Sequence, residues 1–132
     1  MGWDMAGSAW GQRHELYDLS GAVTLANAFI EASGRHVDWM HIPALDRSDD
    51  AFFTPLEGLK SQGVRIYLGL IHHMVRFHAR EATARKDCPD FGVAIYCGFG
   101  REDPATMPNV LKDHLEAVEL SSEVVLTCRS TR

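Results

Sequence analysis

The sequence predicts an α/β domain built from parallel strand–helix units. Segments rich in strand-forming residues alternate with segments that carry apolar residues at helical spacing. The most apolar of them, Val64–Ile71, is typical of a strand that is covered on both faces, which is how parallel sheets are built. With 132 residues the chain has the length of one domain, so we expect residues 1–132 to share a single core.

The first half of the chain predicts a helix, a strand and a shorter helix. The first helix begins at Ser20, a favourable N-cap residue, and ends at Gly34, which suits the left-handed position after a helix. The strand His36–Ile42 is stopped by Pro43, because proline cannot donate a backbone hydrogen bond. The remaining segments of this half are a polar loop and a short helix, Asp46–Asp50 and Pro55–Lys60.

The second half repeats the alternation. The elements expected in order are the strand Val64–Ile71, a helix from Met74 to Lys86, the strand Asp90–Cys97, and a helix capped by Asp103 or Thr106. The apolar face of that last helix consists of Met107, Val110, Leu111, Leu115 and Val118. Two alternatives stay open for Val124–Thr127, namely another strand or a frayed tail over residues 121–132. At the other terminus, Met1–Ala6 is a further candidate strand.

Charge and composition exclude several classes of partner. Thirteen Lys and Arg residues against eighteen Asp and Glu give a net charge of −5, so we expect no nucleic acid and no anionic membrane as partner. The longest apolar runs are far shorter than the ~20 residues of a membrane-spanning helix. Three cysteines without a Cys-x-x-Cys pair, and no signal-peptide order at the N-terminus, favour a cytoplasmic protein.

Residues that can carry chemistry end the three predicted strands. The first strand ends at His41, the second at His72 and His73, and the third at Cys97. We expect these four side chains to lie together, because parallel strands end at one edge of a sheet, where α/β folds bind ligands. Imidazole and thiolate groups are ligands of zinc, and an imidazole beside a thiolate also suits acid–base catalysis.

Two further patterns predict which way the adjacent histidines point and which residue contacts the ligand. Side chains alternate along a strand, so His73 should share the face of Tyr67, whereas His72 should continue the face of Leu68. Arg101 follows a Gly-x-Gly turn after the third strand and is a candidate to hold a carboxylate or a phosphate of the substrate.

The same residues carry a resemblance to a known family. The stretch Phe91–Arg101 resembles the last-strand motif of cobalamin-independent methionine synthase, and Leu68–His72 and Gly2–Ala6 are similar to two earlier strands of that family. The resemblance implies a member of the methionine synthase and uroporphyrinogen decarboxylase superfamily, with the chain forming the second half of a (β/α)₈ TIM barrel. It also implies roles for single residues: Cys97 as a zinc ligand, His72 as the proton donor, and Asp4 as a contact of the substrate. In such an enzyme His41 is the candidate for a second zinc ligand, and His73 is the alternative proton donor.

Two functions from different classes remain open. The first is an enzyme that transfers a methyl or alkyl group to a thiol, with zinc activating the thiolate, although the isolated chain need not be active. The second is a non-catalytic module or remnant that binds a small molecule and has lost the set of metal ligands. The absence of any His-x-Cys pair favours the second function, and the presence of Cys97 and the His72–His73 pair favours the first.

The length of the chain predicts a partner. A complete TIM barrel needs about 250 residues, so this chain has room for about half of one. Half a barrel exposes two sheet edges, whose unpaired backbone groups are templates for pairing. We therefore expect either a homodimer or a separate chain that supplies the missing half-barrel.

Overall fold

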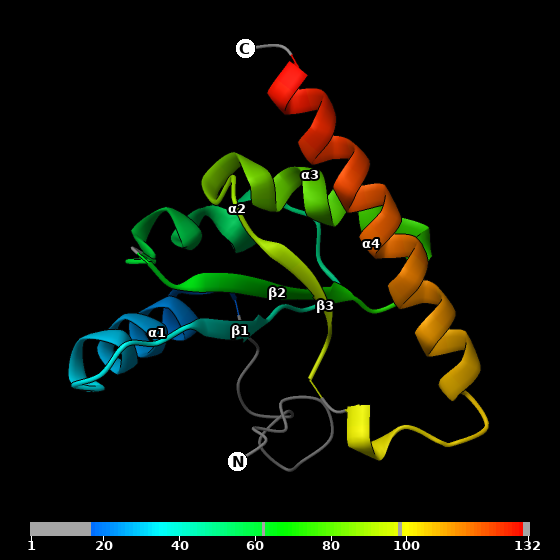
Figure 1. Cartoon of the computed structure of the whole chain (residues 1–132), viewed down its shortest axis with the longest axis horizontal. Coiled ribbons are helices and arrows are strands. Elements are labelled where there is room, and N and C mark those ends of the chain that lie inside the picture. Colours follow the sequence, from blue (N-terminus) through cyan, green and yellow to red (C-terminus); the bar gives the residue numbers. More distant parts are fainter. Residues whose placement is uncertain (1–16, 62, 98, 131–132) are drawn as a thin grey trace.

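The computed structural model describes residues 17–61, 63–97 and 99–130, which form a small sheet with helices packed against it (Figure 1). The elements in chain order are α1 (Ser20–Ala32), β1 (Trp39–Pro43), α2 (Asp50–Phe53), η1 (Thr54–Gly58), β2 (Arg65–Ile71), η2 (Met74–Arg76), α3 (Phe77–Asp87), β3 (Gly92–Ile95), η3 (Phe99–Arg101) and α4 (Met107–Ser130). The candidate strand Met1–Ala6, and with it Asp4, lies outside the described residues.

The described strands form a parallel sheet in the order β1-β2-β3. His41 pairs with Tyr67 and Pro43 with Gly69, so β1 and β2 are in register along the whole of β1. Between β2 and β3 the register shifts at a bulge that follows Leu68. The sheet confirms the predicted α/β class with parallel strand–helix units. Crossovers between parallel strands are right-handed, so a sequential strand order carries the connections over one face.

One face of the sheet, which we call the covered face, contributes to the core. Buried side chains from α1, α2, α3 and α4 join one cluster with residues of all three strands. The members from the covered face of the strands are Ile42, Ile66, Leu68 and Val93, and those from the helices include Val23, Ala26, Phe52, Phe53, Phe77, Ala84 and Ala117. Burial of this apolar surface is the main driving force for the fold.

The opposite face, which we call the open face, carries Trp39, His41, Arg65, Tyr67, Gly69 and Gly92. Trp39 is 63% exposed although it lies in a strand, and Arg65 is exposed beside it. Two rings lie over glycines of the neighbouring strand. A Cβ atom added to Gly69 would lie 2.9 Å from Nε2 of His41, and one added to Gly92 would lie 2.5 Å from the Tyr67 ring. The glycines therefore provide the space that these two rings occupy.

The termini of the first elements differ slightly from the prediction. The first helical residue is Ser20 and the N-cap is Leu19, because the Asp18 carboxylate accepts the Ser20 backbone N–H at 2.9 Å. Gly34 has a φ of +63°, as predicted for the residue after a helix. Pro43 does not stop the strand but is its last residue, which is tolerated because β1 lies at the edge of the described sheet.

The C-terminal segment differs more. Helix α4 continues through Val124–Thr127, so this segment is not a strand. The helix also presents a different face to the core than its apolar pattern predicts. Within residues 107–122, whose burial the structure describes, Ala117 and Ser121 are buried, whereas Leu111, Leu115 and Val118 of the predicted face are exposed. Among the described residues, no helix is both long enough and apolar enough to span a membrane.

Candidate functional site

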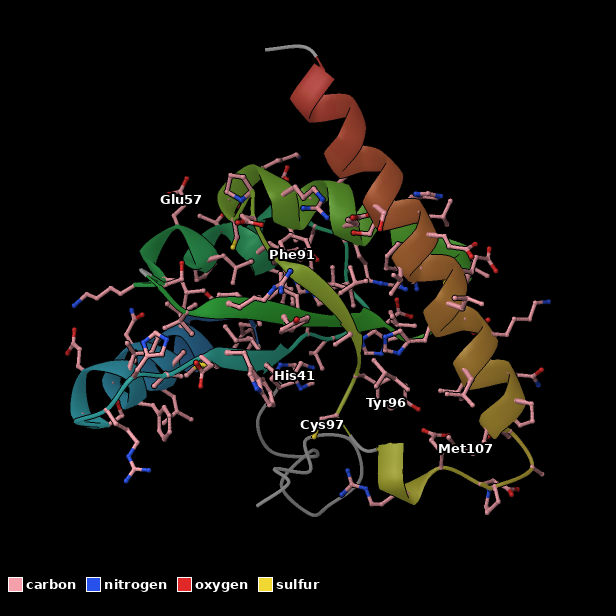
Figure 2. All side chains as sticks on the ribbon, in the orientation of Figure 1. His41, Glu57, Phe91, Tyr96, Cys97 and Met107 are labelled. Carbon is pink, nitrogen blue, oxygen red and sulfur yellow. The ribbon has the colours of Figure 1, made fainter. Side chains whose placement is uncertain are left out.

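The ends of the three strands bring polar side chains to one edge of the sheet, which we call the carboxyl rim. The rim consists of Ala44 and Asp46 after β1, His72 and His73 after β2, and Tyr96 after β3. Figure 2 shows Tyr96 at the end of β3, on the side of the sheet where α4 begins. Parallel α/β folds bind their ligands at this edge.

Asp46 is the centre of the charged part of the rim. Its Oδ2 atom lies 3.1 Å from Nε2 of His73 and 3.4 Å from an Nη atom of Arg76. Its Oδ1 atom accepts a hydrogen bond from Nη1 of Arg80. Arg76 and Arg80 are one helical turn apart, so both guanidinium groups extend toward the same carboxylate. Two arginines against one carboxylate leave this part of the rim positively charged.

Arg80 is a completely buried charge that the backbone holds in place. Its side chain is 0% exposed. Nε donates to the carbonyl of Leu70 at 2.9 Å, and Nη2 donates to the carbonyl of His73 at 2.7 Å. Burial lowers the pKa of Arg80, and Asp46 counteracts this effect. The guanidinium therefore connects α3 to the end of β2 and fixes the position of the Asp46 carboxylate.

His72 occupies the other part of the rim. Its Nε2 atom lies 2.7 Å from the carbonyl oxygen of Ala44, which can only accept a hydrogen bond, so Nε2 carries the proton. The ring stacks on Tyr96 with centroids 5.1 Å apart and planes 8° from parallel. Burial lowers the pKa of His72 below its ordinary value of 6.5. The imidazole is therefore neutral at pH 7 and has Nδ1 as a proton acceptor.

Tyr96 completes this part of the rim. Its hydroxyl group forms a hydrogen bond with the carboxylate of Glu102, and this bond raises the pKa of Tyr96. Since Tyr96 remains protonated, its hydroxyl donates to Glu102. The bulge in β2 lies between Leu68 and Ile71, so the strict alternation that assigns His72 to the Leu68 face does not extend to the end of the strand.

His41 lies in the middle of β1, two residues before the strand ends, and not at its end as the sequence predicts. Its Nε2 atom is buried and has no hydrogen-bond partner of good geometry among the described residues. Burial lowers the pKa of His41, whereas the backbone carbonyl of Ile95 raises it. Cys97 lies two residues after Ile95 and is half-buried in the turn that follows β3. Figure 2 shows the side chains of His41 and Cys97 on the same side of β3.

The other predicted site residues are more dispersed. Arg101 is exposed in η3, and Asp4 lies outside the described residues. His72 and His73 both lie at the rim, but they contact different groups, the Ala44 carbonyl and the Asp46 carboxylate respectively. Within residues 17–61, 63–97 and 99–130, no group of three or more His, Cys, Asp or Glu side chains is placed to hold a metal ion.

Four residues of the rim, η2 and α3 were not expected in the site, namely Asp46, Arg76, Arg80 and Tyr96. Asp46 lies in the polar loop after the first strand, and two arginines at an i, i+4 spacing follow the His72–His73 pair. Applying the parallel-sheet rule to the residues after the strands, and not only to their last residues, would have identified Asp46. Tyr96 was missed because the third strand was expected to continue to Cys97, whereas it ends at Ile95.

No family model, no curated protein and no solved structure matches the chain. The case for a function therefore depends on the geometry of the rim.

Proposed function

We propose that the chain binds a small molecule at the carboxyl rim through a carboxylate or phosphate group of that molecule. The observation that supports this function is the Asp46 carboxylate shared by His73, Arg76 and Arg80. The side chains of Arg76 and His73 are 57% and 52% exposed, so both retain surface for a ligand. A guanidinium group can hold an anionic ligand with two parallel hydrogen bonds.

The rigidity of the rim supports binding. Arg80 is fixed by two main-chain carbonyls, and Asp46 is fixed by Arg80, so the ligand does not have to order these groups. The positive excess of charge is local, since the whole chain carries a net charge of −5. An anion is therefore attracted to this part of the surface and repelled from much of the rest.

Four other residues keep the roles that the sequence predicts for them, now toward the molecule bound at the rim. His72, whose Nδ1 atom is the acceptor nitrogen of the neutral ring, is the candidate to exchange a proton with the bound molecule, and His73 is the second candidate. Arg101 and Asp4 are the candidate contacts for the rest of the molecule. Each of these roles can be tested once a ligand has been found.

The test is a titration of the isotopically labelled chain with inorganic phosphate or with acetate, in which the changes in amide chemical shift are measured by NMR. We expect saturable shifts at residues of the rim, with the stronger probe identifying the preferred anion. Arg76→Gln should weaken binding about tenfold, which is the effect of losing one charged hydrogen bond. Arg35→Gln, at an exposed arginine outside the rim, is the matched control and should have no effect. Equal affinity for both variants would contradict the proposal.

The second candidate function is the zinc-dependent transfer of a methyl or alkyl group to a thiol. It is favoured by one observation, the neutral imidazole of His41 with its unpartnered Nε2 atom near the end of β3. Zinc would lower the pKa of a bound thiol and so generate the nucleophile. His41 and Cys97 would supply two of the three protein ligands of a catalytic zinc site, and within the described residues no third ligand is placed beside them.

Metal analysis tests this second function. If zinc is bound, Cys97→Ser should remove it, and Cys88→Ser should not, because Cys88 is buried and separate from the predicted ligands. Equal zinc content in Cys97→Ser and the unmodified chain excludes Cys97 as a ligand. A chain that contains no zinc when purified without chelator favours the binding function.

We also propose that the sheet is part of a larger, barrel-like assembly. The sequential order β1-β2-β3 is the order in which strands follow one another around a TIM barrel, and the open face would correspond to its interior. The missing strands would come from a second copy or from a partner chain.

A further inference from the structure

Helix α4 carries an apolar surface that the rest of the described chain does not cover. Leu111, Leu115 and Val118 are 56%, 62% and 40% exposed. Their spacing of four and three residues places them in one row along the helix, which we call the α4 stripe. Figure 1 shows α4 running along one side of the molecule, and the exposed fractions show that the other described elements do not enclose this row.

The side of α4 that packs on the body is distinct from the stripe. Ala117 is fully buried, and the hydroxyl group of Ser121 donates to Glu81 on α3 at 2.6 Å and accepts from Arg85 at 2.8 Å. These residues lie about a quarter of a turn from the α4 stripe. The stripe therefore has no role in holding α4 against the sheet.

A positive and a negative residue flank the stripe, so that the flank of one copy can pair with the same flank of a second copy. Lys112 and Glu119 are both exposed, are seven residues apart, and lie on the flank of the stripe that faces away from the body. If a second α4 runs antiparallel, with a two-fold axis at Leu115, then Leu111 of one chain lies beside Val118 of the other. The same axis places Lys112 of each chain beside Glu119 of the other.

From this symmetry we infer that the α4 stripe is the docking surface for a second copy of the chain, in an antiparallel helix pair. A self-complementary surface is what an isologous interface requires, because both copies contribute the same residues. The two Lys112–Glu119 contacts favour the antiparallel direction, because a parallel two-fold pair would place the two charged flanks on opposite sides of the pair, where neither contact can form. The apolar row is short, so the dimer is a reversible one.

The oligomeric state tests this inference. At about 100 µM, in the range of weak interfaces, light scattering should give twice the monomer mass of 14.7 kDa, and dilution should lower it. Leu115→Asp should give the monomer mass at every concentration, because it places two carboxylates at the two-fold axis. Leu25→Asp, at an equally exposed leucine of α1, is the matched control and should remain a dimer.

A charge exchange identifies the partner as a second copy. Lys112→Glu alone and Glu119→Lys alone should each weaken the dimer about tenfold, because each replaces two attractions by two repulsions. The double variant should restore it, since the pairs form again with the charges reversed. A chain that is monomeric at 100 µM, a Leu115→Asp variant that remains a dimer, or a double variant no better than the single ones would each overturn the inference.

Discussion

The two faces of the sheet come from the same strands but are stabilised in different ways. On the covered face, Ile66 and Leu68 are 2% and 0% exposed and contact helices whose side chains are also buried. On the open face, Trp39 is largely exposed, and the rings of His41 and Tyr67 lie over glycines of the next strand. The covered face therefore depends on the volume of its side chains, whereas the open face depends on the absence of side chains at two positions.

The two faces also differ in the kind of side chain that they carry. The strand residues of the covered face are apolar, but the open face and the rim carry imidazole, phenol and guanidinium groups. Parallel sheets normally have both faces covered. A face that none of the described helices covers is thus a candidate surface for a ligand, for a second chain or for another segment of the same chain.

Truncation of a side chain behind the covered face should have the largest effect. Phe53→Ala removes a ring that is 0% exposed, and we expect a loss of about 3–5 kcal/mol in the free energy of unfolding. Trp39→Ala removes a larger ring from the open face and should cost about 1 kcal/mol or less, including its edge-to-face contact with Tyr67. Urea denaturation measures both changes. Similar losses would show that the open face contributes to the core.

Addition of a methyl group should destabilise the open face, where the glycines leave space for rings. Gly92→Ala places a Cβ atom 2.5 Å from the Tyr67 ring and should cost about 1–3 kcal/mol. In the background Tyr67→Ala the same substitution should be close to neutral, because the ring that it meets is gone. The control Gly21→Ala has open space around it and should stabilise α1 by about 0.5 kcal/mol. Independence of the Gly92 and Tyr67 effects would contradict the ring-over-glycine packing.

The smallest expected effect is a dependence of stability on pH. Burial lowers the pKa values of His41 and His72 in the folded chain, so the unfolded chain binds protons first as the pH falls below about 6.5. The stability is therefore complete above pH 6.5 and decreases toward the lowered folded pKa values. The decrease should be about 1 kcal/mol or less, since both rings are partly solvated. The double variant His41→Gln/His72→Gln should flatten the curve of unfolding free energy between pH 7.5 and 5, and an unchanged curve would assign the dependence to other groups.

Much of the sheet could be predicted from the sequence, because its strands are apolar runs with clear limits. The β2 strand, for example, was expected at Val64–Ile71 and lies at Arg65–Ile71. Helix α3 was also expected, from Met74 to Lys86, but its buried side is mixed, since Arg80, Glu81 and Thr83 are buried together with Phe77 and Ala84. Such polar residues can be buried only because partners up to 40 residues away satisfy them, as Ser121 satisfies Glu81. A hydropathy pattern contains no information about those partners.

The candidate site shows the same limit. The positions of His72 and His73 at the rim follow from the end of an apolar strand, which the sequence shows directly. The Asp46–Arg80 contact joins residues 34 apart and depends on how α3 returns across the sheet. The bulge in β2 interrupts the alternation of side chains, so the stacking of His72 on Tyr96 could not be predicted by counting residues.

The central position of β2 has a consequence for how the chain opens. Residues Tyr67 and Leu68 pair with β1 on one side and with β3 on the other. Their amide protons point to the inside of the described sheet and exchange only when a neighbouring strand detaches, whereas the outer amides of β1 and β3 can exchange through fraying of an edge. We therefore expect the slowest amide exchange among the described residues in β2, where it reports global unfolding. This is the strand that leads into the charged rim.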